Sequence, residues 1–257
     1  MPELLTVTHK TFAQAGYVVL RDVLSADQCD EIWDFVAASL DPLVGPAEFE
    51  ADVGYPGSPA DRQAPGGTTP RRLLHAYARS SLLRRLACHE VVGSALKQII
   101  VNDVRLSQCH HNCVMTKHPG YSSNTLWHQD IRYWSFDRPE LVSAWFALRP
   151  ENRANGALEA IPGSHRIDMD RGRFDRDLFL RSEIPENQEL LRQAITVELN
   201  AGDVLLFHCR LFHAAGKNRT DRVKLSPVFT YHSGDNLPIP GTRSSQYPSV
   251  NIDRHLT

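Results

Sequence analysis

The segment Trp127-His128-Gln129-Asp130 carries two side chains that could bind one metal ion. On an extended strand, residues two positions apart point to the same side, so the side chains of His128 and Asp130 would share a face. A second histidine on that face would complete the two-histidine, one-carboxylate set of non-haem Fe(II) oxygenases. Short motifs also arise by chance, and a surface histidine beside a turn aspartate is the alternative interpretation.

Two histidines in residues 202–222 could supply the third ligand. His208 ends an apolar strand, and His213 precedes the turn at Gly216-Lys217-Asn218. The favoured interpretation of His208 is a core histidine bonded to backbone, which leaves His213 as the favoured ligand and His208 as its rival.

Arg222 follows His213 by nine positions. If residues 217–218 form a two-residue hairpin loop, His213 and Arg222 are direct cross-strand neighbours, about 5 Å apart at Cβ. An arginine beside a metal suits a dicarboxylate co-substrate, because one end chelates the metal and the far carboxylate meets the guanidinium. Lys224 has the same strand parity and is a rival for this role.

The elements that must position these residues change in kind along the chain. Helical patterns come first, at 8–15, 25–40 and 70–100, apart from a short strand at 17–20. Alternation typical of strands follows, at 102–115, 141–148, 195–199, 203–208 and 223–231. This order predicts a mainly β protein with N-terminal helices packed on one sheet. A double-sheet jelly roll is the natural closed form.

Residues 42–70 hold eleven prolines and glycines. This density predicts no regular structure. A long ordered loop in a compact domain is usually functional, so the segment is interpreted as an active-site lid, with a disordered surface insertion as the alternative.

Composition excludes several classes of protein. The 257 residues carry 28 Lys and Arg against 30 Asp and Glu, so no basic excess favours nucleic acid or an anionic membrane. No apolar run approaches the roughly 20 residues of a membrane span. The first residues lack a signal-peptide pattern, and the five cysteines contain no C-x-x-C pair. We therefore expect one domain over 1–257, with reduced thiols, in the cytoplasm. The oligomeric state cannot be read from the sequence.

An ordered set of motifs links the chain to a known family. It resembles the phytanoyl-CoA dioxygenase-like branch of the Fe(II)/2-oxoglutarate oxygenases. The motifs are Phe12–Leu20, Lys117–Gly120, Trp127–Asp130, Asn155–His165, Gly202-Asp203 and His213–Arg222. The resemblance implies a double-stranded β-helix fold, with Fe(II), 2-oxoglutarate and O2 as the cofactor and co-substrates.

The resemblance also assigns roles to particular residues. His128, Asp130 and His213 become the iron ligands, and Arg222 the clamp for the distal carboxylate of 2-oxoglutarate. Trp145 and Cys113 fall near co-substrate positions. Several family members have the basic residue eleven positions after the distal histidine, where this chain has Lys224, although spacing of nine also occurs. The turn before His165 is expected to shape the site's mouth.

The implied activity is hydroxylation of an aliphatic C–H bond in a small metabolite, with release of succinate and CO2. The expected substrate-lining residues are Arg72, His75, Gln108, Tyr133 and Trp134. Arginines near position 72 would suit an anionic substrate, although a solvated helix face is the preferred interpretation of them. A non-catalytic cupin-like metal-binding or ligand-binding protein and a zinc hydrolase stay open as alternatives.

Overall fold

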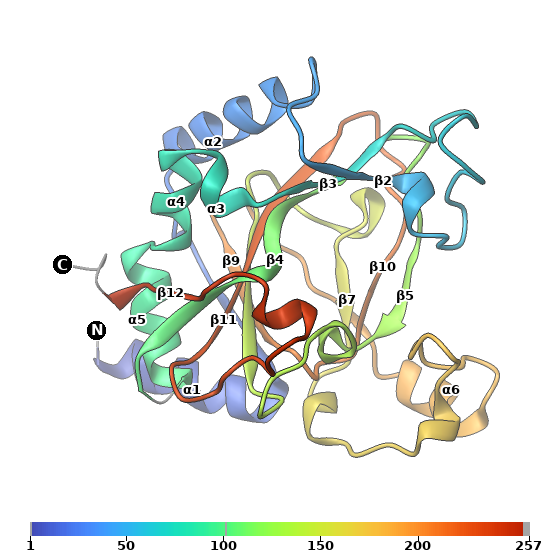
Figure 1. Cartoon of the computed structure of the whole chain (residues 1–257). Coiled ribbons are helices and arrows are strands. Elements are labelled where there is room, and N and C mark those ends of the chain that lie inside the picture. Colours follow the sequence, from blue (N-terminus) through green and yellow to red (C-terminus); the bar gives the residue numbers. More distant parts are fainter. Residues whose placement is uncertain (1, 101, 254–257) are drawn as a thin grey trace.

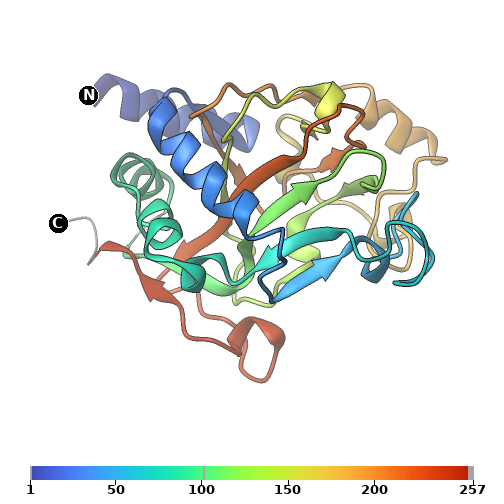
Figure 2. The same ribbon diagram turned by 90° about the horizontal axis from the view of Figure 1, so that it is seen from above.

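Two antiparallel β-sheets face each other, and helices cover the outer side of the larger sheet (Figure 1). The structure is a computed structural model that describes residues 2–100 and 102–253. Helices α1 to α5 form the covering layer, seen from above in Figure 2. The helices are α1 (Pro2–Ala15), α2 (Ala26–Ala38), α3 (Ala76–Arg79), α4 (Ser81–Ala87), α5 (Glu90–Ile99) and α6 (Pro185–Leu191).

The larger sheet has eight strands, in the order β1-β9-β6-β11-β4-β3-β2, with β12 paired to β4. Their bounds are β1 (Tyr17–Leu20), β2 (Ala47–Phe49), β3 (Pro70–Leu74), β4 (Val104–Lys117), β6 (Leu141–Phe146), β9 (Val204–His208), β11 (Lys224–Ser233) and β12 (Val250–Asn251). The smaller sheet has the order β5-β10-β7-β8. Its strands are β5 (Thr125–His128), β7 (Leu158–Ala160), β8 (Ile195–Thr196) and β10 (His213–Ala215).

Strand alternation divides the apolar residues of the larger sheet between two cores. On β4, Leu106 and Val114 pack against the helices, while Cys113 lies in the cluster between the two sheets. A bulge separates the pairs Thr230–Ser107 and Phe229–Asn112, so β4 carries four extra residues there. Because that number is even, the two faces keep their identity across the bulge.

The predicted mainly β jelly roll with N-terminal helices on one sheet is confirmed. The strand predicted at 17–20 is β1, and the strand predicted at 203–208 is β9 with one residue fewer. The helix after Leu24 begins with the expected capping box, in which Ser25 and Gln28 exchange side-chain and backbone hydrogen bonds.

Two expectations near residue 70 are wrong. Pro70–Leu74 forms strand β3, which pairs with β4, where the sequence suggested the start of a helix. The Pro- and Gly-rich stretch before it contains strand β2 and the 3-10 helix η1 (Glu50–Asp52). The free edge of β4 supplies hydrogen bonds to β3, and this tertiary pairing overrides the local helical pattern.

The predicted hairpin around residues 217–218 is also wrong. β10 pairs with β5 and β7 in the smaller sheet, whereas β11 pairs with β4 and β6 in the larger one. The chain therefore crosses between sheets at 216–223, and His213 is not a strand neighbour of Arg222. Asn218 holds this crossing, since its Nδ2 donates to the carbonyl oxygens of Lys117 at 2.8 Å and Arg222 at 2.7 Å.

Candidate active site

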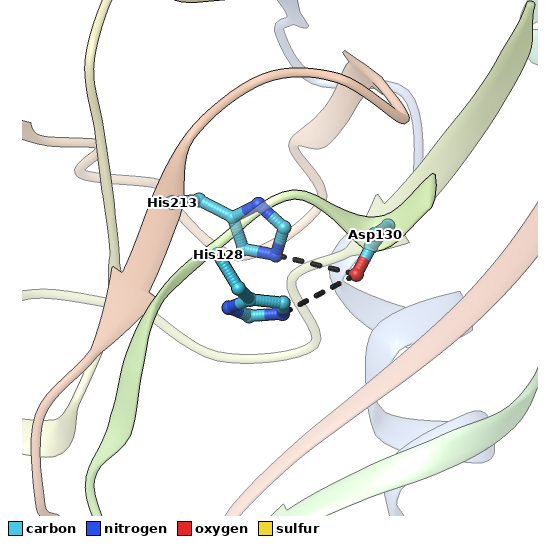
Figure 3. A group of neighbouring side chains, drawn as sticks. All are labelled: His128, Asp130 and His213. Atoms are coloured by element: carbon cyan, nitrogen blue, oxygen red, sulfur yellow. Dashed lines mark ion pairs between the residues drawn. The ribbon is translucent and has the colours of Figure 1, made fainter. Parts of the chain in front are cut away.

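Three buried side chains converge between the sheets. The Nε2 atoms of His128 and His213 each lie 3.5 Å from Oδ1 of Asp130 (Figure 3). One donor atom from each residue falls within 4.8 Å of the others, close enough to hold one metal ion. The two histidines and the carboxylate predicted from the sequence thus meet in one cluster.

Both histidines are oriented by the backbone that precedes them. Nδ1 of His128 donates to the carbonyl oxygen of Leu126 at 2.8 Å, and Nδ1 of His213 donates to that of Leu211 at 3.0 Å. This hydrogen bond assigns the proton of each neutral ring to Nδ1 and leaves the Nε2 lone pair facing Asp130. Such outer hydrogen bonds are typical of histidines that ligate metals.

Asp130 lies just beyond strand β5, as the first residue of the 3-10 helix η2 (Asp130–Tyr133). It still faces His128, because Gln129 between them keeps an extended backbone, with φ −113° and ψ 134°. The turn is fixed to the segment before β10. The amide of Ile131 donates to the carbonyl of Cys209 at 3.0 Å, and Gln129 Nε2 donates to that of Arg210 at 2.5 Å.

The electrostatics of Asp130 fit a cation site. The side chain is fully buried, and neither carboxylate oxygen has a hydrogen-bond partner among the described residues. Burial by itself would raise its pKa, but His111 and His213 outweigh burial and hold the pKa well below its usual value. Burying an ionised carboxylate without hydrogen bonds is costly, and a divalent metal on these three residues would remove that cost. The donor set suits Fe(II).

A third histidine adjoins the cluster. His111 lies in the β4 bulge with its Nδ1 3.4 Å from Oδ2 of Asp130. Burial lowers the pKa of His111 to about 4, so the ring is neutral at physiological pH. No role for His111 was predicted from the sequence. The signal was present, because His111 has the same strand parity as Cys113.

A pocket opens from the triad into the space between the sheets. Its lining includes Trp145, Met115 and four cationic side chains, Arg71, Arg72, Lys117 and Lys224. Three of these cations have carboxylate partners. Arg72 makes two hydrogen bonds to Glu48, at 2.7 and 2.8 Å, and Nη1 of Arg71 lies 3.4 Å from Oε2 of Glu50.

The third pair is the most enclosed. Nζ of Lys224 lies 2.7 Å from Oε2 of Glu151, with both side chains at most 5% exposed. The other carboxylate oxygen of Glu151 accepts hydrogen bonds from Trp145 Nε1 at 3.0 Å and Ser226 Oγ at 2.6 Å. The lysine ammonium also lies 5.0 Å from the centre of the Trp145 ring. Glu151 thus links the side chains of Lys224 and Ser226 on β11 to that of Trp145 on β6.

Residues 42–70 contribute Tyr55 to the lining of the pocket. The hydroxyl of Tyr55 lies 2.8 Å from that of Tyr133, and the Tyr55 ring packs edge-on against Phe179. Buried Glu50 anchors the same segment, because its Oε2 accepts a hydrogen bond from the amide of Ser123 at 3.2 Å. We call the Tyr55, Tyr133 and Phe179 side chains the aromatic roof. It adjoins the His128 ring, which lies 5.8 Å from both Tyr133 and Phe179.

The structure brings some of the predicted residues into this pocket. Trp145, Arg72 and Tyr133 line it. Cys113 is fully buried behind the lining, where its Sγ lies 3.8 Å from Sδ of Met115. Trp134 is buried with its ring against His111.

Other predicted residues lie elsewhere. Arg222 is exposed and borders a separate surface hollow with Trp33 and Arg149, because the chain leaves the smaller sheet before reaching it. His75 packs against Tyr247, and Gln108 Nε2 donates to the carbonyl of Pro248 at 2.7 Å, so both contact the C-terminal segment outside the pocket.

Two further histidines are placed as the sequence suggested. His208 stays outside the metal-binding cluster, and its Nδ1 accepts a hydrogen bond from the amide of Arg210 at 3.0 Å. His165 packs against the His208 ring at 5.3 Å. The turn before it supports strand β10 more than the mouth of the site, since Ser164 Oγ accepts a hydrogen bond from the Phe212 amide at 2.9 Å.

Fold and site together define a jelly-roll protein in which two histidines and one carboxylate meet, the donor set of non-haem Fe(II) oxygenases. Residues 12–226 match the family described as phytanoyl-CoA dioxygenase (PhyH). The chain belongs to this family, and it is an Fe(II)- and 2-oxoglutarate-dependent dioxygenase.

Relatives with known names agree with this assignment. Ectoine dioxygenase of Sphingopyxis alaskensis is 26% identical over 242 residues, covering 88% of this chain and 74% of that protein. Phytanoyl-CoA dioxygenase 1 of Oryza sativa is 30% identical over 112 residues, covering 44% of this chain and 38% of that protein.

Solved structures share the fold. The structure of EctD from S. alaskensis with 2-oxoglutarate and 5-hydroxyectoine superposes with a TM-score of 0.74 at 21% identity, covering 95% of this chain and 84% of that one. The epimerase SnoN in complex with Fe3+, alpha ketoglutarate and nogalamycin RO also gives 0.74, at 24% identity, covering 94% and 92%. None of the helices in the described part of the chain is long and apolar enough to cross a membrane.

Proposed function

We propose that this enzyme hydroxylates an aliphatic C–H bond of a small metabolite, with Fe(II) held by His128, Asp130 and His213. The observation that carries the proposal is the convergence of these three buried donors on one point at the wall of a pocket. Bound iron and 2-oxoglutarate would supply the oxidation, releasing succinate and CO2. The protein would hold the substrate carbon in place and exclude water.

The basic end of the pocket suits the co-substrate. 2-Oxoglutarate is a dianion, and Lys117, Lys224 and the Trp145 ring lie together on the pocket wall. We propose that its distal carboxylate is bound here, where buried cations attract an anion strongly. This replaces Arg222 in the role that the sequence suggested.

The aromatic roof is the proposed substrate contact. Tyr133 lies beside His128 and links to Tyr55 of the 42–70 segment. We propose that this segment acts as a lid over the iron. Arg71 and Arg72 give little support for an anionic substrate, because Glu50 and Glu48 already neutralise them. A small polar metabolite agrees better with this balance of charge.

An anaerobic titration tests the iron and co-substrate assignment. Adding Fe(II) and then 2-oxoglutarate should produce a weak visible charge-transfer band that depends on both. His213→Ala should abolish the band, whereas the control His208→Ala should keep it. Metal binding without a band would favour a non-catalytic metal-binding protein or a zinc hydrolase. A screen for substrate-dependent succinate release would follow a positive result.

We also propose that the enzyme works in the cytoplasm. The five cysteines are all free thiols. Free thiols are typical of proteins in reducing compartments. Growth of a tagged strain followed by cell fractionation tests this proposal, and recovery of the enzyme from an oxidising compartment would contradict it.

A further inference from the structure

Two lysines face each other at the basic end of the pocket. Lys117 of β4 and Lys224 of β11 are direct partners in the antiparallel register, and both side chains are buried. Like charges opposite each other in a sheet are destabilising, so their placement requires compensation by anions. The two lysines differ in whether a carboxylate of the protein neutralises their charge.

Lys224 is neutralised by the protein. Its partner Glu151 is buried and held in place by Trp145 and Ser226. Moving Lys224 to another anion would leave the carboxylate of Glu151 buried without its charge partner, which is costly.

Lys117 has no such partner. Its Nζ donates to two backbone carbonyl oxygens, of Gly216 at 2.6 Å and Ser123 at 3.2 Å, and no carboxylate of the described residues lies within ion-pairing distance. An ammonium group has three N–H donors, so one remains. Gly156 leaves room for the lysine stem, since a Cβ there would lie 2.9 Å from Cδ of Lys117 and 2.6 Å from the Gly216 oxygen.

We infer that Lys117, and not Lys224, is the main anchor for the distal carboxylate of 2-oxoglutarate. This inference rests on the proposed binding of 2-oxoglutarate in the pocket. Anchoring by Lys117 would also make the site electrically neutral. The charges of Fe(II), the Asp130 carboxylate, the Lys117 ammonium and the 2-oxoglutarate dianion sum to zero. The ion pairs of Lys224, Arg71 and Arg72 add nothing to that sum.

The surroundings of Lys117 support this role. Burial lowers its pKa to about 7, helped by Lys224 of β11 and Arg71 of β3, while Glu50 of η1 and Glu151 oppose the change. A carboxylate bound to Lys117 would favour the ammonium form. Binding of 2-oxoglutarate should therefore be accompanied by proton uptake above pH 7.

The test compares 2-oxoglutarate with 2-oxopentanoate, which has a methyl group in place of the distal carboxylate. The Kd of each is measured anaerobically from the charge-transfer band of the Fe(II) enzyme. We expect wild type to prefer 2-oxoglutarate by at least about 30-fold, and Lys117→Met to lose this preference. The double variant Lys224→Met/Glu151→Gln removes both charges of the other pair and should keep most of the preference. Lys97→Met, at the surface, is the matched control.

The opposite pattern would overturn the inference. If the double variant loses the preference and Lys117→Met keeps it, Lys224 is the anchor. If wild type binds both acids equally, neither lysine anchors the distal carboxylate. If neither acid produces a band in wild type, the proposed function itself fails, which distinguishes that result from the others.

A measurement on wild type alone guards against a variant that does not fold. The Kd of 2-oxoglutarate divided by the Kd of 2-oxopentanoate should increase as the pH rises from 6.5 to 9. The increase should approach about tenfold per pH unit. Effects of pH on the metal ligands cancel in this ratio. A ratio that does not change with pH would contradict the role of Lys117.

Discussion

His213 pairs directly with His128 across strands β10 and β5, and the centres of their rings lie 4.3 Å apart. One backbone register therefore sets the separation of two of the three proposed iron ligands. A shift of one residue would turn one imidazole to the opposite face of the sheet. The hydrogen bonds from Ile131 and Gln129 to the segment before β10 protect this register.

Fe(II) should stabilise the folded protein through Asp130. A ligand that binds only the native state at 100 times its Kd adds about 2.7 kcal/mol to the free energy of unfolding. We expect a higher anaerobic melting temperature with Fe(II) in wild type and no such increase in Asp130→Asn, which lacks the anionic ligand. An equal increase in both proteins would show that the metal binds elsewhere.

Glu151→Gln should destabilise the protein without touching the metal ligands. The substitution leaves the buried ammonium of Lys224 uncompensated, at an expected loss of about 3–5 kcal/mol. Urea unfolding measures this loss. The double variant Glu151→Gln/Lys224→Met removes the unpaired charge and should recover much of the stability. A double variant as unstable as the single one would argue against the ion pair as the cause.

Tyr55→Phe should loosen the 42–70 segment. The change removes the hydroxyl that contacts Tyr133, worth about 1 kcal/mol, so local opening should increase roughly fivefold. Hydrogen exchange followed by mass spectrometry should show faster exchange in peptides covering residues 50–58. Tyr121→Phe, at an exposed tyrosine, serves as the control. Unchanged exchange in that region would mean that the tyrosine pair does not hold the segment.

Acid should destabilise the protein through His110. Burial, with the positive charges of Arg243 and His111, lowers its pKa to about 3 from the ordinary 6.5. Between these values the unfolded chain binds a proton that the folded protein does not. The free energy of unfolding should therefore fall as the pH drops from 6.5 towards 3, by about 1.4 kcal/mol per pH unit from this residue.

His110→Gln isolates that contribution. Glutamine can still contact the Ser244 hydroxyl, which lies 2.7 Å from Nε2 of His110, but it does not titrate. Urea unfolding between pH 4 and 7 should show that the free energy of unfolding depends less steeply on pH in the variant. The difference should correspond to one proton fewer taken up on unfolding. Parallel curves for the two proteins would show that His110 is not the group responsible.

The sequence was most informative where chemistry and local pattern coincide. The two-residue spacing of His128 and Asp130 was enough to predict a shared face, and the structure agrees even though Asp130 begins a 3-10 helix. The apolar strands could be found because alternation follows from burying one face of a sheet. His213 was favoured over His208 because His208 was interpreted as a core histidine bonded to backbone, and its Nδ1 does accept a backbone hydrogen bond.

The failures all concern long-range pairing. Local pattern cannot tell whether the strand after Asn218 returns to its predecessor or joins the opposite sheet, and that choice removed Arg222 from the pocket. Glu151 looks like an ordinary loop residue until the fold places it against Lys224. Tyr55 lies in a segment without periodicity, so no sequence signal indicated its position in the pocket lining beside Tyr133.

The aromatic roof has a consequence for how such an enzyme can diverge. Its Tyr55 side comes from a segment far upstream of β5 and β10, which carry the two histidines. Point changes or insertions in residues 42–70 can therefore alter which molecule is accepted while the oxidative machinery stays intact. An engineer seeking new substrate selectivity would randomise that segment first. Natural variation in the same segment can change selectivity in the same way.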